Sequence, residues 1–155
     1  KLLAVISNSV PFKPNMNAIS ERTGISLNTM KNYLKLLNDA QLLQLLYVED
    51  KGINSLGKPE KIFLNNPNLM YNLGNDTDKG NVRETFFLNQ VQHQYAVFAS
   101  KTVDFKVDGR YEFELGGRNK KQKQIKELPN AFLVKDDIEI GTEQNIPLWL
   151  FGFLY

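Results

Sequence analysis

The spacing of hydrophobic and polar residues in the N-terminal part of the chain predicts two helices. A short helix is expected over residues 17–24, with Asn17 as its N-cap and Gly24 as the left-handed residue that ends it. A second helix is expected from Ser26 to about Ala40, because hydrophobic residues recur there every three or four positions and form one stripe. The stripe consists of Met30, Tyr33, Leu34 and Leu37.

Two apolar runs, 42–48 and 61–64, follow the helices and predict the strands of a hairpin. A polar loop over residues 49–59, which contains Gly and Pro, separates the two strands. Helix, turn, helix and two-stranded wing is the order of a winged helix-turn-helix module. We therefore expect residues 1–73, which end in a short helical stretch, to form a winged helix-turn-helix domain.

The second block, residues 74–155, begins with a polar segment that is typical of a domain boundary. An amphipathic helix is predicted over residues 82–95, and Asp108-Gly109 further on is a strong hairpin signal. Short elements are predicted at 96–99, 102–107, 111–115, 131–134, 139–140 and 146–155, the last one a helix that starts near Pro147. The whole chain is thus expected to belong to the α/β (α+β) class, with two small domains.

Composition excludes several kinds of function. The chain has no cysteine and one histidine, so disulfide frameworks, thiolate zinc sites and cysteine nucleophiles are ruled out. No apolar run approaches the roughly 20 residues of a membrane-spanning helix, so we expect a cytoplasmic protein without a membrane partner. A helical apolar pattern is already under way at Lys1, which indicates a fragment that has lost an N-terminal part.

The charge distribution favours the first block as a nucleic-acid surface. The net charge is only +2, but residues 1–61 carry eight Lys or Arg against five Asp or Glu, while the remainder carries eleven against twelve. In a helix-turn-helix the second helix enters the major groove of DNA. The predicted DNA contacts on its polar face are Asn28, Thr29, Lys31, Asn32 and Lys35, and the predicted phosphate contacts from the wing are Lys51 and Lys58.

The alternative interpretation of this polar face is a solvated surface, because winged helices also serve as protein–protein adaptors and as spacers between domains. A similar choice applies to residues 118–126, which contain five Lys or Arg and no acid. This basic stretch is either a second phosphate-binding patch or a solvated face.

Three acids of the second block occupy positions that suit a metal-dependent nuclease: Glu84 on the helix, and Asp104 and Glu114 on successive strands. Phosphodiester hydrolysis needs hard oxygen ligands for Mg²⁺, and two carboxylates on adjacent strands, Asp104 and Glu114, can supply them. A lysine usually follows the second acid by two residues, and that position is Gly116 here. The lysines of the next element that could replace it are Lys120, Lys121 and Lys123, and Lys120 is included with the three acids as a catalytic candidate. The alternative is that these acids are ordinary surface charges.

Several segments resemble the part that follows the ATPase module in a family of prokaryotic AAA-superfamily ATPases. In the first block they are residues 26–37, 40–43 and 58–69; in the second they are residues 81–87, 103–105 and 113–125. The resemblance implies a P-loop ATPase module, with its ATP, in the missing N-terminal part, and a C-terminal domain of unknown function similar to PD-(D/E)xK nucleases, a restriction-endonuclease-like fold. Glu84, Asp104 and Glu114 match the acidic positions of that pattern, whereas Gly116 departs from its lysine.

The resulting hypothesis is an accessory region, not itself catalytic, that binds DNA through the winged helix and partners its own ATPase module. The first alternative is an Mg²⁺-dependent nuclease of the PD-(D/E)xK type. The second is a protein-interaction scaffold. We expect no cofactor beyond Mg²⁺ at the acids in the nuclease case.

Overall fold

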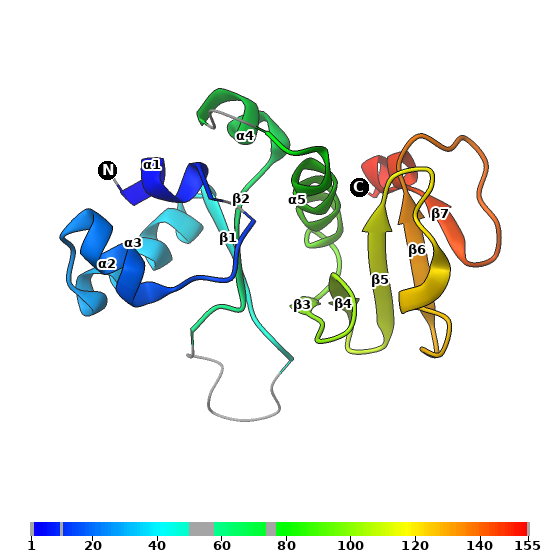
Figure 1. Ribbon diagram of the computed structural model, residues 1–155, viewed down its shortest axis with the longest axis horizontal. Helices are drawn as coiled ribbons and strands as arrows, with labels where there is room; N and C mark the ends of the chain where they lie inside the picture. The colour runs from blue at the N-terminus through cyan, green and yellow to red at the C-terminus, as the bar shows by residue number, and fades with distance from the viewer. Residues whose placement is uncertain (1, 10, 50–57, 74–76, 155) are drawn as a thin grey trace.

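The computed structural model describes residues 2–9, 11–49, 58–73 and 77–154. Three short helices, α1 (Leu2–Ser7), α2 (Met16–Thr23) and α3 (Leu27–Asp39), lie on one side of a two-stranded sheet. Another helix and a five-stranded sheet lie on the other side (Figure 1). The protein is therefore mixed helix and sheet, as the sequence predicts.

The turn between α2 and α3 confirms part of the local prediction. Gly24 ends α2 with φ of 71°, the left-handed conformation that glycine adopts at low cost. Ser26 caps α3 by accepting a hydrogen bond from the Thr29 backbone N–H. The cap of α2 was predicted wrongly: Asn15, not Asn17, accepts the hydrogen bond from the Ala18 backbone N–H.

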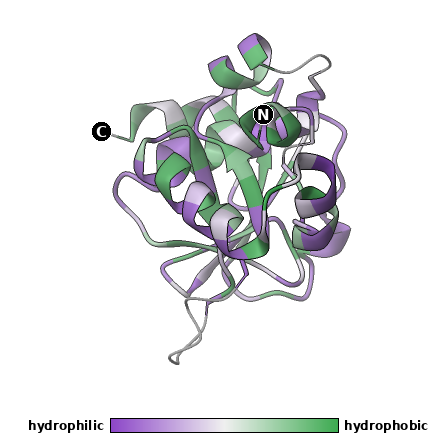
Figure 2. Ribbon diagram, turned by 90° about the vertical axis from the view of Figure 1, so that its left-hand side faces the viewer, coloured by the Kyte–Doolittle hydropathy of each residue, from purple (hydrophilic) through white to green (hydrophobic). Residues whose placement is uncertain are grey.

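The apolar stripe of α3 is narrower than the sequence indicates. Met30 and Leu34 are buried, and Leu37 is half-buried against the same core. Tyr33 is 45% exposed, because it lies at the edge of the stripe and turns away from the core. Figure 2, viewed from the side of these helices, shows the hydrophobic strands behind them and hydrophilic residues distributed over the helices themselves.

Strands β1 (Leu43–Leu46) and β2 (Lys61–Leu64) form the predicted antiparallel pair, with Leu43 opposite Leu64 and Leu46 opposite Lys61. Side chains alternate between the two faces of a strand, and here each face packs on a different core. On β2, Ile62 belongs to the core under α1–α3, whereas Phe63 belongs to the core of the second block. The hairpin is thus shared by the two halves of the molecule.

Helices α4 (Pro67–Leu73) and α5 (Lys79–Val91) connect the hairpin to the second sheet. Asp78 caps α5 by accepting a hydrogen bond from the Asn81 backbone N–H, so α5 starts three residues before the predicted Val82. Val82 packs against the core of the first block, whereas Phe87, Leu88 and Val91 are buried in the core of the second. The domain boundary at residue 74 stays a prediction, and Leu46 and Phe63 of the first block belong to the core of the second.

The five-stranded sheet has the order β3-β4-β5-β6-β7. Its first three strands are antiparallel, and β6 and β7 each run parallel to the neighbouring strand of lower number. Asp108 and Gly109 connect β4 to β5 with positive φ values of 50° and 64°, as their sequence predicts. The strand bounds are β3 (Val97–Ala99), β4 (Phe105–Val107), β5 (Tyr111–Gly116), β6 (Ala131–Lys135) and β7 (Asn145–Pro147).

One prediction near the C-terminus needs correction. Residues 139–140 do not form a strand; Ile140 is 86% exposed, because a single apolar residue beside Glu139, without a partner strand, buries nothing. The last strand is β7 instead, and its Pro147 lies at the edge of the sheet, where a missing N–H costs no ladder bond. A 3-10 helix, η3 (Leu148–Phe153), follows it.

No helix in the described part of the chain is both long and apolar enough to cross a membrane.

Candidate functional site

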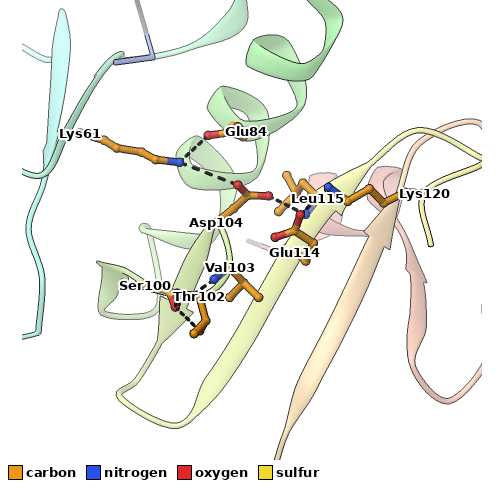
Figure 3. A network of polar contacts seen from close by, with 9 residues as sticks. All are labelled: Lys61, Glu84, Ser100, Thr102, Val103, Asp104, Glu114, Leu115 and Lys120. Carbon is orange, nitrogen blue, oxygen red and sulfur yellow. Dashed lines mark hydrogen bonds and ion pairs between the residues drawn. The ribbon is translucent and has the colours of Figure 1, made fainter. Parts of the chain in front are cut away.

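The three predicted acids come together at one place in the fold. Glu84 projects from α5, Asp104 lies immediately before β4, and Glu114 lies in β5 (Figure 3). Two lysines reach the same group from opposite sides: Lys61 from β2 and Lys120 from the turn after β5. We call these five residues the acid–lysine cluster.

A short turn positions Asp104. The Ser100 hydroxyl oxygen accepts hydrogen bonds from the Thr102 and Val103 backbone N–H groups, and the Val103 side chain is buried. This arrangement brings the chain back to the sheet at Asp104, immediately before β4. The Asp104 Oδ2 then accepts the Leu115 backbone N–H at 2.8 Å, so one carboxylate oxygen fastens the loop to β5 and the other faces the cluster.

Lys61 joins two of the acids. Its Nζ lies 3.1 Å from Glu84 Oε2 and 3.8 Å from Asp104 Oδ1. The strand alternation that places Ile62 on the first core places Lys61 on the opposite face, toward the second block. A residue of the first block therefore supplies a cation to acids of the second block.

The nuclease-like pattern has a lysine at position 116, where this chain has glycine, and the Lys120 side chain lies beside that position. Its Nζ lies 2.5 Å from Glu114 Oε1, and the Glu114 side chain is only 4% exposed. A Cβ atom added to Gly116 would lie 2.5 Å from both Cβ and Cγ of Lys120. The stem of Lys120 thus occupies the volume that a side chain at position 116 would take, and its ammonium group reaches the acid that a lysine at 116 is expected to accompany.

Burial and mutual repulsion perturb two of the acids. Burial raises the pKa of Glu84; the Asp104 carboxylate raises it further, and Lys61 opposes the rise without cancelling it. Burial also raises the pKa of Glu114, against the lowering effect of the hydrogen bond from Lys120. Both carboxyl groups therefore hold a proton more readily in the folded protein than in an unfolded chain.

The donor set of the cluster has the right chemistry for Mg²⁺, because carboxylate oxygens are its preferred protein ligands. The arrangement nevertheless does not fit a bound ion. Glu84, Asp104 and Glu114 each direct an oxygen at a lysine ammonium group, and no group of three or more acidic, His or Cys side chains among the described residues has a metal-holding arrangement. We therefore derive no reaction step through a metal ion.

A second candidate site lies in the first block, in a groove of about 450 Å³ between α3 and the hairpin. Lys31, Asn32 and Lys35 from α3, together with Lys58 from the approach to β2, line this groove, which we call the basic groove. All three lysines are exposed, and none of them forms an ion pair with a residue that the structure describes. Asp39, at the end of α3, is the acidic residue in its lining.

The remaining predicted DNA contacts behave differently from one another. Asn28 is exposed on α3 but outside the basic groove. The Thr29 side-chain oxygen lies 2.9 Å from the Ser26 hydroxyl, so it takes part in the helix cap. Lys51 lies outside the described residues.

The predicted basic stretch 118–126 forms turns and a short 3-10 helix, η2 (Gln122–Gln124), instead of a regular helix face. Lys121 and Lys123 are exposed. Ile125 is buried and anchors the stretch to the sheet. Of the three lysines considered as replacements at position 116, Lys120 makes the contact with Glu114.

Sequence reasoning missed Lys61. The signal available was the period-two alternation of β2, which separates Ile62 and Leu64 from Lys61 and Phe63. That pattern shows that Lys61 leaves the first core, but it does not show which residues of the chain lie opposite. The contact joins positions 23 residues apart through the packing of the hairpin on α5.

Comparisons with known proteins do not identify a family for this chain. No family model matches the chain, and neither a curated protein nor a solved structure matches it significantly.

Proposed function

We propose that this chain is a nucleic-acid-binding accessory module of an AAA-type ATPase, and that DNA binds at the basic groove. The link to an ATPase rests on the sequence resemblance of both blocks. The order α2, turn, α3, β1 and β2 supports the winged helix-turn-helix interpretation, with α3 as the helix that would enter the major groove. The second block would then serve as a folded support with a nuclease-like arrangement of acids.

The observation that carries the proposal is the set of three unpaired lysines around one groove. Lys31, Lys35 and Lys58 have no acidic partner among the described residues, so their charges remain available to phosphate oxygens. Phosphate contacts release condensed counterions and supply most of the non-specific affinity of DNA-binding proteins. Asn32 lies in the same groove and has the donor and acceptor pair that can read adenine.

Fluorescence anisotropy with a labelled duplex tests this proposal. We expect the unmodified chain to bind at low salt, and the double variant Lys31→Ala/Lys35→Ala to bind roughly tenfold or more weakly, because two phosphate contacts are lost. The matched control is Lys79→Ala/Lys101→Ala, which removes the same charge from exposed positions outside the groove. Equal weakening in both double variants would reduce the effect to net charge and contradict a specific groove.

Metal-dependent phosphodiester hydrolysis is a second candidate function; it would require the Lys61 ammonium group to leave Glu84 and Asp104, and one observation favours it. Lys120 supplies an ammonium group to Glu114 despite the glycine at position 116, so the acids and the lysine of a nuclease-like set lie together. The test is incubation of labelled duplex and single-stranded DNA with the protein and Mg²⁺ or Mn²⁺. Cleavage that disappears in Asp104→Asn would make this function the primary one, and absence of cleavage would remove it.

A protein-interaction scaffold is the outcome if neither binding nor cleavage is found.

A further inference from the structure

Lys61 belongs to the first block, whereas both of its acidic partners among the described residues belong to the second. Its ammonium group lies between Glu84 and Asp104, at 3.1 Å and 3.8 Å from their nearest oxygens (Figure 3). Its side chain is 30% exposed. The Phe105 ring lies close to the same ammonium group, with the centroid 5.9 Å from Nζ.

The charges of the cluster are nearly balanced without any added ion. Three carboxylates face two ammonium groups, and Lys61 contacts the two carboxylates that Lys120 does not reach and offsets one of their two negative charges. A divalent cation between Glu84 and Asp104 would compete with Lys61 for Asp104 Oδ1, because Asp104 Oδ2 accepts the Leu115 backbone N–H, and it would lie within a few ångströms of a positive charge. Occupation by Lys61 and occupation by a metal ion are therefore mutually exclusive.

The backbone of Lys61 cannot withdraw on its own. It is paired with Leu46 across the hairpin, and the next two residues of β2, Ile62 and Phe63, are fully buried in the two different cores. Only the flexible side chain can leave the acids. Loss of its charge, or rotation of its side chain toward solvent, would leave Glu84 and Asp104 without a cation.

We propose that Lys61 is the resident cation of the acid–lysine cluster: it fastens the hairpin to the second block and excludes divalent metal ions from Glu84 and Asp104. This inference goes beyond DNA binding at the basic groove and does not depend on it. It also explains how a set of acids suited to Mg²⁺ exists in an arrangement that does not fit the ion. The ion pairs of the cluster then hold the two blocks together, and the cluster is not a metal centre.

Isothermal titration calorimetry with Mn²⁺ alone, on the full chain, tests the proposal without relying on catalysis. We expect Lys61→Gln to bind Mn²⁺ roughly tenfold or more tightly than the unmodified chain, because a positive charge close to the ion is removed. Lys61→Arg, which keeps the charge, should bind no more tightly than the unmodified chain. Lys31→Gln, which removes an exposed charge on α3, is the matched control for net charge, and it should not change the affinity.

The gain in affinity must also depend on the acids. Adding Asp104→Asn to Lys61→Gln should abolish it. Circular dichroism checks that each variant is folded; if Lys61→Gln is not, Lys61→Met keeps the aliphatic stem against Phe105 and takes its place. Equal Mn²⁺ affinity with and without the Lys61 charge would overturn the proposal, and so would a folded Lys61 variant that binds no Mn²⁺.

Discussion

The basic groove and the acid–lysine cluster use the same residue type in opposite ways. In the groove, Lys31, Lys35 and Lys58 are exposed and have no acidic partner among the described residues. In the cluster, Lys61 and Lys120 are about two-thirds buried and lie within ion-pair distance of carboxylates. The first group is available to an external anion, whereas the second has found its anions inside the fold.

This difference shows why lysine content alone does not identify a binding surface. Removal of one member of a partly buried ion pair leaves the other member buried without a partner for its charge. The resulting loss in the free energy of unfolding is therefore large. An exposed lysine contributes little to stability, since its charge is solvated in both the folded and the unfolded chain. Substitutions in the cluster should therefore alter stability, and substitutions in the groove should alter binding.

The largest expected effect on stability comes from Lys120→Ala. It leaves Glu114, with 4% of its side chain exposed, without its partner. We expect a loss of about 2 kcal/mol in the free energy of unfolding, below the 3–5 kcal/mol of a fully buried pair, because Lys120 is one-third exposed and Glu114 can take up a proton. Urea denaturation measures the loss. Lys123→Ala, an exposed neighbour, should change stability by less than about 0.5 kcal/mol, and a similar loss in both variants would contradict the comparison.

A lysine introduced at position 116 should partly replace Lys120 beside Glu114. Gly116→Lys alone should destabilise the protein, because the new Cβ would overlap the Lys120 stem. In Gly116→Lys/Lys120→Ala the volume is free and a lysine again lies beside Glu114. A double-mutant cycle should therefore show a favourable coupling of about 1 kcal/mol or more between the two substitutions. If the losses in unfolding free energy of the two single variants simply add in the double variant, a lysine at position 116 does not replace Lys120.

A smaller effect should appear in the pH dependence of stability. The pKa of Glu84 is raised in the folded state, mainly by burial, above the ordinary value of 4.5. The folded state therefore binds this proton more readily, and the contribution of Glu84 to stability is fully present below pH 4.5 and is lost as the pH rises through the folded pKa.

The comparison with Glu84→Gln isolates this contribution, because the variant cannot titrate at that position. The difference in unfolding free energy, unmodified chain minus Glu84→Gln, should become more positive as the pH falls through this window. Chemical denaturation at a series of pH values gives the difference directly. A difference that stays constant, or that falls on acidification, would show that Glu84 is not destabilised as a carboxylate in the folded protein.

The smallest expected effect is in the basic groove itself. Asp39 lines the groove with Lys35, one turn earlier on α3, and it repels phosphate. Asp39→Asn should tighten duplex binding about two- to fivefold at low salt and less at high salt, because added ions screen the removed repulsion. Anisotropy at two salt concentrations measures both values. Weaker binding would indicate that DNA does not approach this end of the groove.

Local sequence signals were sufficient for much of the first block. Gly24 and Ser26 act through hydrogen bonds and backbone angles within a few residues, so their roles follow from residue type and position. The choice of Asn17 over Asn15 as a cap failed because both residues are suitable and only the helix start distinguishes them. The prediction that Tyr33 belongs to the buried stripe was wrong for a related reason, since periodicity locates the centre of an apolar stripe better than its edges.

The acid–lysine cluster was predictable only in part. The order of Glu84, Asp104 and Glu114 along a helix and two strand-like runs singled them out as one candidate set, but it did not show whether they converge; the structure brings them together. Lys61 was not predictable, because its contact depends on a hairpin of the first block packing against α5. The failed strand at 139–140 has a similar cause: strands need partners distant in the sequence, which local patterns do not identify.

The salt dependence of duplex binding tests most directly whether DNA binds at the basic groove. Each lysine that contacts a phosphate contributes about 0.9 to the slope of the logarithm of affinity against the logarithm of salt concentration. We predict that Lys31→Ala/Lys35→Ala reduces this slope by about 2, whereas Lys79→Ala/Lys101→Ala leaves it unchanged. An unchanged slope in the groove variant, with binding intact, would show that DNA contacts another surface and would contradict the account.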